Sequence, residues 1–200
     1  MIAGLAALMA APVAAQRVKL TPTAGYTLGG SLSGRDFSYS LGDGFSWGGI
    51  LGLGVARGSN FALIFNYMST DLTERNRSTN VSSVLGDVAV WHLQGGGSYE
   101  FGGSDNVTPF VDGHLGVSVM NPGDLTGFGQ PSTETRFGFN FGLGADVARW
   151  IKVGSRLWLV LTNAGGGFWC GPGGCAVGAG GDVVAQIEFY GGINIGGRRR

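Results

Sequence analysis

The residues best suited to chemistry in this sequence are acids, bases and histidines that alternate with apolar residues. Together they could form an acid–base site or an ion path, because the set combines carboxylates with imidazole, ammonium and guanidinium groups. They could also form a network of paired charges that fills the inside of a barrel, because buried charges must be paired. We favour the paired network. The set consists of Asp87, His92, Glu100, Asp112, His114, Glu134, Arg136, Asp146, Lys152, Arg156, Asp182 and Glu188.

A catalytic nucleophile needs a base within hydrogen-bond reach. A barrel hydrolase that modifies lipid would show a close His-x-Ser pair with a nearby carboxylate, but His114-Leu115-Gly116 lacks that serine. The glycine-rich segments 165–167 and 171–174 neither follow a strand nor open a helix, so they are not typical of phosphate sites. We therefore expect no enzyme activity and no cofactor.

The two cysteines, Cys170 and Cys175, are separated by four residues and have no histidine nearby. This arrangement is poorly suited to zinc, which takes four nitrogen or sulfur ligands, so we expect no metal site. In an exported protein the same pair predicts a local disulfide.

The start of the chain is typical of a signal peptide. The apolar run Met1–Ala11 precedes small residues at Val13-Ala14-Ala15, where a signal peptidase would cut. No Lys or Arg precedes this run, and the alternative is a buried N-terminal helix. The chain is therefore expected to comprise a signal peptide over residues 1–15, an outer-membrane β-barrel over residues 16–197 and a basic tail over residues 198–200.

The composition excludes two classes of protein. Thirteen basic and thirteen acidic residues cancel, so no basic field exists to attract nucleic acid. Outside the N-terminal segment there is no run of about 18 apolar residues, so we expect no transmembrane helix. A chain without such a helix can cross a membrane only as a closed barrel, because every backbone group must be hydrogen-bonded in lipid. Glycine accounts for 40 of 200 residues, which is typical of strands that bend around a crowded interior.

Apolar and polar residues alternate in eight segments, which is the period of a β-strand with two different faces. The clearest is the sixth, where Phe137, Phe139 and Phe141 alternate with glycine, asparagine and glycine. We predict an all-β fold, a closed eight-stranded antiparallel up-and-down transmembrane β-barrel. The segments begin near Val18, Phe45, Asn60, Ala89, Phe110, Arg136, Ile151 and Asp182.

The links between these segments alternate between long and short, beginning with a long one. Outer-membrane barrels have long external loops and short periplasmic turns, so this order indicates a membrane barrel with a periplasmic N-terminus. The long links are predicted at residues 34–44, 69–83, 121–132 and 163–181, and the short ones at residues 57–59, residues 102–108 and Arg149.

The bulky apolar face is predicted to face lipid, and the face rich in glycine and polar residues is predicted to fill the lumen. An eight-stranded barrel leaves room only for packed side chains, which favours small residues inside. The alternative is a soluble up-and-down barrel with its apolar side chains inside.

Three segments resemble the eight-stranded outer-membrane barrels of the OmpA/OmpX-like superfamily: Thr-Ala-Gly-Tyr at 23–26, Thr-Pro-Phe-Val at 108–111 and the phenylalanine–glycine repeat at 137–146. The resemblance covers nearly all of the chain after residue 15. It implies a barrel fold in the bacterial outer membrane, reached by export through the periplasm, and no catalytic residues. Such barrels usually finish on an aromatic residue that the assembly machinery reads, whereas this sequence continues through Gly196-Gly197 to Arg198–Arg200.

We therefore expect a small outer-membrane barrel with a structural or surface-interaction role, whose external loops present the binding surface. The alternatives are a narrow channel for small or apolar solutes and a lipid-modifying membrane hydrolase. The expected partners are outer-membrane lipid and lipopolysaccharide, and the resemblance also implies the barrel-assembly machinery and periplasmic chaperones. We expect a monomer that binds no nucleic acid.

Overall fold

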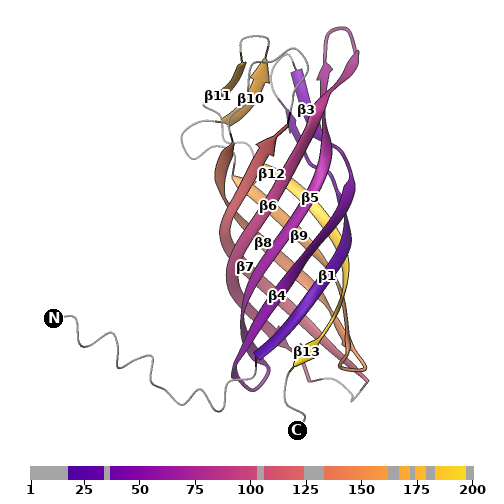
Figure 1. The fold of residues 1–200 in the computed structure, drawn as a ribbon, viewed down its shortest axis with the longest axis vertical. Coiled ribbons are helices and arrows are strands. Elements are labelled where there is room, and N and C mark those ends of the chain that lie inside the picture. Colours follow the sequence, from indigo (N-terminus) through magenta and orange to yellow (C-terminus); the bar gives the residue numbers. More distant parts are fainter. Residues whose placement is uncertain are drawn as a thin grey trace, which may run out of the picture.

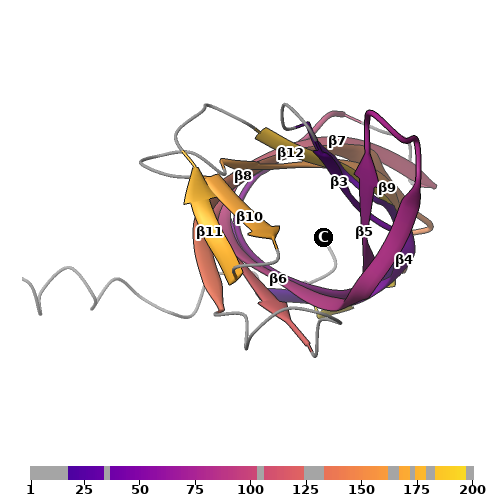
Figure 2. The same cartoon turned by 90° about the horizontal axis from the view of Figure 1, so that it is seen from above.

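Eight antiparallel strands close on themselves in the computed structural model of the chain (Figures 1 and 2). The structure describes residues 18–33, 37–102, 106–123, 133–161, 167–171, 174–178 and 183–196. The order around the wall is β1, β4, β5, β6, β7, β8, β9 and β12, and β12 pairs with β1 to close the ring. The predicted eight-stranded all-β barrel is therefore confirmed.

The strands of the wall are long and regular, and short strands extend or accompany them. The wall strands are β1 (Val18–Leu28), β4 (Gly44–Ala56), β5 (Ser59–Asn76), β6 (Ser82–Glu100), β7 (Val107–Pro122), β8 (Glu134–Val147), β9 (Ile151–Leu161) and β12 (Val183–Ile193). The short strands are β2 (Ser31–Ser33), β3 (Phe37–Leu41), β10 (Gly167–Gly171), β11 (Gly174–Gly178) and β13 (Ile195–Gly196).

The protruding part of β5 and β6 lies at one end of the barrel, and the short turns at residues 57–58 and 148–150 lie at the other end, where the first and last described residues, Val18 and Gly196, also lie (Figure 1). Part of what the sequence indicated as loop is strand. Most of residues 69–83 continues β5 and β6 as a protruding hairpin, residues 37–41 form β3, and residues 163–181 include the hairpin of β10 and β11. Residues 1–17 and 198–200, which hold the predicted signal peptide and basic tail, lie outside the described part of the chain.

Apolar side chains cover the outside of the wall over most of its height. Trp47 is 49% exposed and Phe141 is 58% exposed, whereas the residues between them in the alternation, such as Ser46 and Asn140, are fully buried. On β5, the stretch from Phe61 to Asp71 rises about 25 Å along the barrel axis, at ~3.4 Å per residue and a tilt of about 40°. This is the height of the apolar band of an outer-membrane barrel.

Glycines allow neighbouring strands to approach each other closely on the lumenal side. A Cβ atom at Gly96 would clash with the backbone oxygen of Gly113 on β7, whereas a Cβ at the outward-facing Gly95 would meet only ordinary side-chain contacts. This difference explains in part why the inward positions of the sequence are so rich in glycine.

Candidate functional site: the barrel lumen and its external rim

The lumen is crossed near the terminal end of the barrel by an ion-pair cluster centred on Lys19. Its ammonium group on β1 lies 2.8 Å from Asp146 on β8 and 3.4 Å from Glu100 on β6. Lys152 lies 3.0 Å from the other oxygen of Asp146 and 3.4 Å from the ring centre of Phe110. Since β1 neighbours neither β6 nor β8 in the wall, Lys19 bridges the lumen from side to side.

Glu188 is the hub of the central lumen. One carboxylate oxygen accepts hydrogen bonds from Ser46 at 2.9 Å and Asn66 at 2.7 Å, and the other accepts from Trp158 at 3.0 Å and Arg156 at 3.3 Å. Glu188 lies on β12, and its partners lie on β4, β5 and β9, so these bonds connect opposite walls of the barrel. Its side chain is 1% exposed, so the buried charge is fully compensated by hydrogen bonds and one ion pair.

A second central group surrounds Asp112 and His114 on β7. Asp112 lies 4.0 Å from Arg156 and 3.6 Å from His114. Asn140 donates its amide hydrogen to Gln94 at 2.6 Å, so its oxygen must accept from His114 Nδ1 at 3.1 Å. That proton on Nδ1 leaves the lone pair of a neutral His114 on Nε2, which has no partner among the described residues.

His114 and Asp112 line a cavity that is also bounded by Lys19, Glu100 and Lys152. The cavity has a volume of about 30 Å³. This is enough for one or two water molecules and far below the roughly 300 Å³ of a typical small-molecule site. This cavity is therefore too small for an organic ligand, and the described side chains around it form a packed polar core.

The lumen also contains a close His–Ser pair. The spacing of these residues along the sequence did not reveal it. His92 Nδ1 on β6 lies 2.8 Å from Ser118 Oγ on β7, and the ring of His92 stacks on Trp158 of β9 at 4.2 Å and 13°. Ser118 is completely buried, and no described carboxylate is within hydrogen-bonding or ion-pairing distance of His92. A nucleophile in this position cannot reach a lipid. The pair joins two neighbouring strands, whereas the stack of His92 on Trp158 connects β6 with β9 across the lumen.

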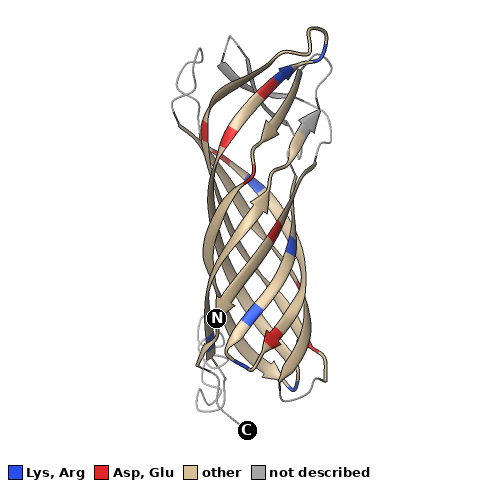
Figure 3. Cartoon of the chain, turned by 90° about the vertical axis from the view of Figure 1, so that its right-hand side faces the viewer, with Lys and Arg blue, Asp and Glu red and all other residues tan. Residues whose placement is uncertain are grey.

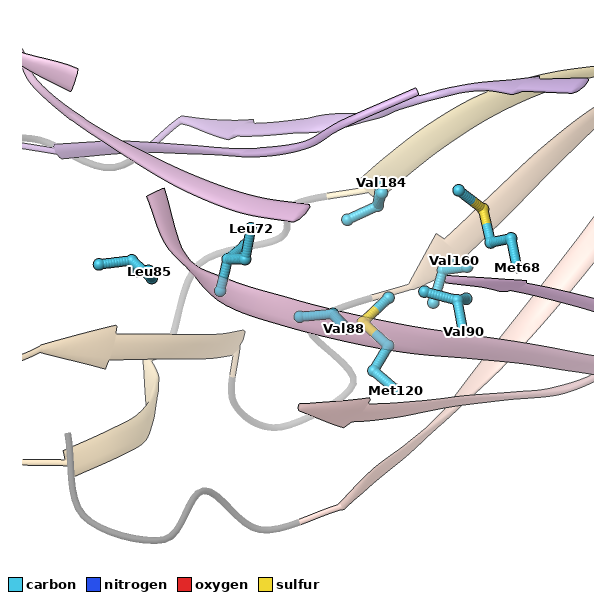
Figure 4. Packing of buried hydrophobic residues seen from close by; sticks show 8 residues of the cluster. All are labelled: Met68, Leu72, Leu85, Val88, Val90, Met120, Val160 and Val184. Carbon is cyan, nitrogen blue, oxygen red and sulfur yellow. The ribbon is translucent and has the colours of Figure 1, made fainter. Parts of the chain in front are cut away.

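The external part of the lumen is apolar, which differs from the polar lumen that the alternation predicted. Eight buried side chains from strands on several sides pack together, and Tyr39 and Leu41 of β3 pack against them. Figure 4 shows how they fill the space between the strands. We call this cluster the apolar seal: Met68, Leu72, Leu85, Val88, Val90, Met120, Val160 and Val184.

Asp87 does not belong to the lumen, contrary to the prediction. Its side chain is exposed, and it lies opposite Asp71 on the outer face of the β5–β6 hairpin. Its position has the same parity as Ala89 and Trp91, which face outward, so the alternation itself places Asp87 outside. The prediction relied on the charge of Asp87 alone and therefore assigned its side chain to the wrong face of the strand.

Glu134 and Arg136 pair with each other at 3.0 Å near the external end of β8, and each side chain is about one-fifth exposed. They are not part of the central network.

Asp182 lies outside the described residues. The remaining predicted residues lie in the lumen: His92, Glu100, Asp112, His114, Asp146, Lys152, Arg156 and Glu188.

The backbone of β10 and β11 places Cys170 directly opposite Cys175 in an antiparallel hairpin. The side chains of both residues lie outside the described part, so the disulfide stays a prediction.

Sequence reasoning missed Lys19 and the polar neutral partners of the network, although Lys19 falls on the predicted inward face. The alternation of inward and outward residues along β1 was the signal that would have identified Lys19 as a lumenal residue.

Among the described residues there is no group of three or more His, Cys, Asp or Glu side chains that could hold a metal ion. Likewise, no helix in the described part of the chain is long and apolar enough to span a membrane.

The outer face carries an aromatic cluster on three neighbouring strands, made up of Trp47 on β4, Phe65 and Tyr67 on β5, and Trp91 on β6. Ring centres lie 5.3 Å apart for Trp47 and Tyr67, 4.6 Å for Tyr67 and Trp91, and 5.6 Å for Phe65 and Trp91. The charged residues of the chain are sparse along the wall and recur on the protruding hairpin (Figure 3).

Comparison with known proteins supports a membrane barrel. The family model for the outer membrane protein beta-barrel domain matches residues 3–159. The Neisserial surface protein A has a similar structure, with a TM-score of 0.56, 16% identity and coverage of 89% of this chain and 96% of that chain. The outer membrane protein OprG from Pseudomonas aeruginosa gives a TM-score of 0.59 and 13% identity, with coverage of 91% and 96%. A search of curated proteins gives no match.

Proposed function

Because the chain belongs to the outer membrane protein β-barrel family, we propose that it is a closed barrel that anchors a surface-interaction region at its external end. The observation that carries this proposal is the filled lumen. Lys19, Glu188 and the stack of His92 on Trp158 bridge it at successive levels, and the apolar seal fills its external part. A solute would have to displace all four layers, which favours an anchoring role over transport.

The shape of the external end supports the same role. The β5–β6 hairpin and β3 continue beyond the apolar band (Figure 1). One structurally similar protein is named a surface protein, which fits a role at the cell surface. We propose no catalytic role, because the only His–Ser pair among the described side chains is sealed inside the lumen.

Planar-bilayer recording of the purified barrel tests the proposal. We expect no steady single-channel current, because ion-paired side chains and apolar side chains both occupy the lumen. Large and stable currents from the wild-type protein would contradict an anchoring role. Cell fractionation with heat-modifiable gel migration tests the membrane location, and a soluble, heat-insensitive protein would contradict it.

A narrow channel for apolar solutes is the second candidate. The specific observation that favours it is the apolar seal, which contains the flexible residues Met68 on β5 and Met120 on β7. Such side chains could admit a small apolar molecule from outside. Uptake of a small hydrocarbon into liposomes that contain the barrel would favour this candidate, and unchanged uptake relative to empty liposomes would count against it.

The route to the membrane is also a proposal. We infer that the chain is exported to the periplasm and inserted by the barrel-assembly machinery with the help of periplasmic chaperones, as a monomer. Depletion of that machinery should cause loss of the heat-modifiable form. Unchanged folding after depletion would contradict this route.

A further inference from the structure

We propose that Asn76, at the tip of the β5–β6 hairpin, is an acceptor for an N-linked glycan, which an oligosaccharyltransferase in the periplasm transfers from a polyprenyl diphosphate carrier. This inference rests on the proposed export through the periplasm. It goes beyond the anchoring role because it adds a covalent modification to the external end of the barrel.

The described strands and turns contain three triplets with the composition of a glycan acceptor. This composition is Asn, then any residue except Pro, then Ser or Thr. Because the three triplets share the motif, the motif alone does not distinguish them, and their local structures have to be compared. The triplets are Asn76-Arg77-Ser78, Asn80-Val81-Ser82 and Asn106-Val107-Thr108.

The side chain of Asn76 closes a turn with the two residues that follow Arg77. Its Oδ1 atom accepts hydrogen bonds from the backbone N–H of Ser78 at 2.9 Å, the hydroxyl of Ser78 at 2.7 Å and the backbone N–H of Thr79 at 3.2 Å. All of these bonds lie within four residues, so the turn can form in the exported chain before the barrel folds.

This turn prepares the amide of Asn76 for glycan transfer. The three donors around Oδ1 stabilise negative charge on the oxygen, so they make a proton on Nδ2 easier for a base of the transferase to remove. Nδ2 then attacks the anomeric carbon of the first sugar of the carrier. The bond from Nδ2 to that carbon forms, the bond from the carbon to the diphosphate oxygen breaks, and polyprenyl diphosphate leaves with the electron pair.

The other two triplets do not bring the hydroxyl to the amide. The Oδ1 atom of Asn80 accepts from two nitrogens of Arg75 at 3.0 and 2.6 Å, and Ser82 is paired with Arg75 in the sheet of β5 and β6. Thr108 lies in the extended strand β7, opposite Asp146. Residues i and i+2 of an extended chain are about 7 Å apart, which holds the hydroxyl of such a triplet away from its amide.

An acid also distinguishes the first triplet. Glu74 lies two residues before Asn76, on the same face of β5. A carboxylate beside the acceptor amide gives the transferase a charged group that it can bind through Arg or Lys. A serine occupies the corresponding position before both Asn80 and Asn106.

The tip of the hairpin leaves space for a bulky group. Residues 77–80 are exposed and lie beyond Arg75 and Ser82, the last residues that β5 and β6 pair with each other. The two strands protrude from the end of the barrel (Figure 1). A glycan on Asn76 therefore adds to the external surface without disturbing the lumenal network or the apolar seal.

The experiment expresses the full chain in bacteria together with an oligosaccharyltransferase and a polyprenyl-diphosphate-linked oligosaccharide of known mass. Intact-mass spectrometry and peptide mapping of the barrel from the outer membrane measure the glycan occupancy. We expect wild type to gain one oligosaccharide, attached to Asn76, and Asn76→Gln to abolish this gain. Ser78→Ala should lower the occupancy about fivefold or more, the factor that corresponds to one lost hydrogen bond. The matched controls Asn80→Gln and Asn106→Gln should stay within about twofold of wild type.

An exported protein with a flexible acceptor loop, produced in the same cells, shows that the transferase is active. When that protein is glycosylated, an unmodified wild-type barrel would overturn the inference. Occupancy of Asn80 or Asn106 equal to that of Asn76, or full occupancy in Ser78→Ala, would overturn it as well. Heat-modifiable migration of every variant separates these outcomes from failure of the proposed function, because a chain that does not reach the outer membrane as a folded barrel contradicts that function instead.

Discussion

Two regions inside the same eight-stranded barrel are filled with opposite kinds of side chain: the central lumen is polar and the apolar seal is hydrophobic. In the central lumen the buried Glu188 depends on four donors at defined distances. In the seal, side chains such as Met68 and Val90 need only contact and exclusion of water. The polar part therefore specifies which strands meet and in which register, and the apolar part closes the end without directional constraints.

Removing the hub of the polar region should have the largest effect. Glu188→Ala would remove the nearer ion-pair partner of the buried Arg156, leave only Asp112 at 4.0 Å, and deprive Ser46, Asn66 and Trp158 of their acceptor. This should lower the free energy of unfolding by about 3–5 kcal/mol. Urea unfolding in liposomes, followed by tryptophan fluorescence, measures this loss. Glu74→Ala on the external hairpin is the control, and an equal loss there would remove the distinction between the two regions.

Truncation in the seal should have the next largest effect. Met120 is 4% exposed, and Met120→Ala should cost about 2–4 kcal/mol through lost burial and the cavity left behind. Met120→Leu conserves the volume and should cost less than about 1.5 kcal/mol. If the two variants unfold at the same urea concentration, the seal is not a packed core.

Adding a single methyl group should distinguish the two faces of one strand. Gly96→Ala would press a Cβ against the backbone of Gly113, and we expect a loss of about 1–3 kcal/mol. Gly95→Ala on the lipid side should change the free energy of unfolding by less than about 0.5 kcal/mol. The same liposome assay applies, and a larger loss from Gly95→Ala would show that the lumenal side is not the crowded one.

The smallest effect is expected at the external end of β8. Arg136 makes one ion pair, with Glu134, and both side chains are about one-fifth exposed, so Arg136→Ala should cost about 1 kcal/mol, which is well below the loss from Glu188→Ala. A loss as large as that of Glu188→Ala would place Arg136 in the central network after all. Comparing the unfolding midpoints of the two variants tests this directly.

The sequence predicted the strand number, the order of long and short links and the face of most residues, because a period of two is preserved through the membrane. It did not predict the seal. Above Tyr67 on β5 and Trp91 on β6 the alternation reverses, so that inward residues such as Leu72 become apolar and outward ones such as Asp71 become polar. A strand that leaves the membrane exchanges lipid for water on its outer face, and its inner face becomes the hydrophobic one. Residues 69–83 therefore resembled a polar loop, although most of them are paired in the hairpin.

The identity of the central hub was hidden for a different reason. Glu188 and Asp87 are both acids within alternating segments. Parity assigns them to different faces, but only the cross-lumen distances show that Glu188 is bonded to four donors. Sequence parity gives the face of a residue, but it does not give its height or its partner on a strand that is distant in the chain. Lys19 shows the same limit, since its partners Asp146 and Glu100 lie on strands it does not neighbour.

The position of Glu188 on the last wall strand has a consequence for how the barrel assembles. Its partners Ser46, Asn66 and Arg156 are all synthesised earlier and belong to strands that can pair before β12 arrives. Pairing of β12 with β9 already brings Glu188 to Arg156, but Ser46 and Asn66 on β4 and β5 gain this acceptor only when the seam between β12 and β1 forms. Closure of the wall and completion of the core thus become a single cooperative event. We therefore expect an unfinished barrel to be hydrated inside and to be cut by protease more readily than a finished one.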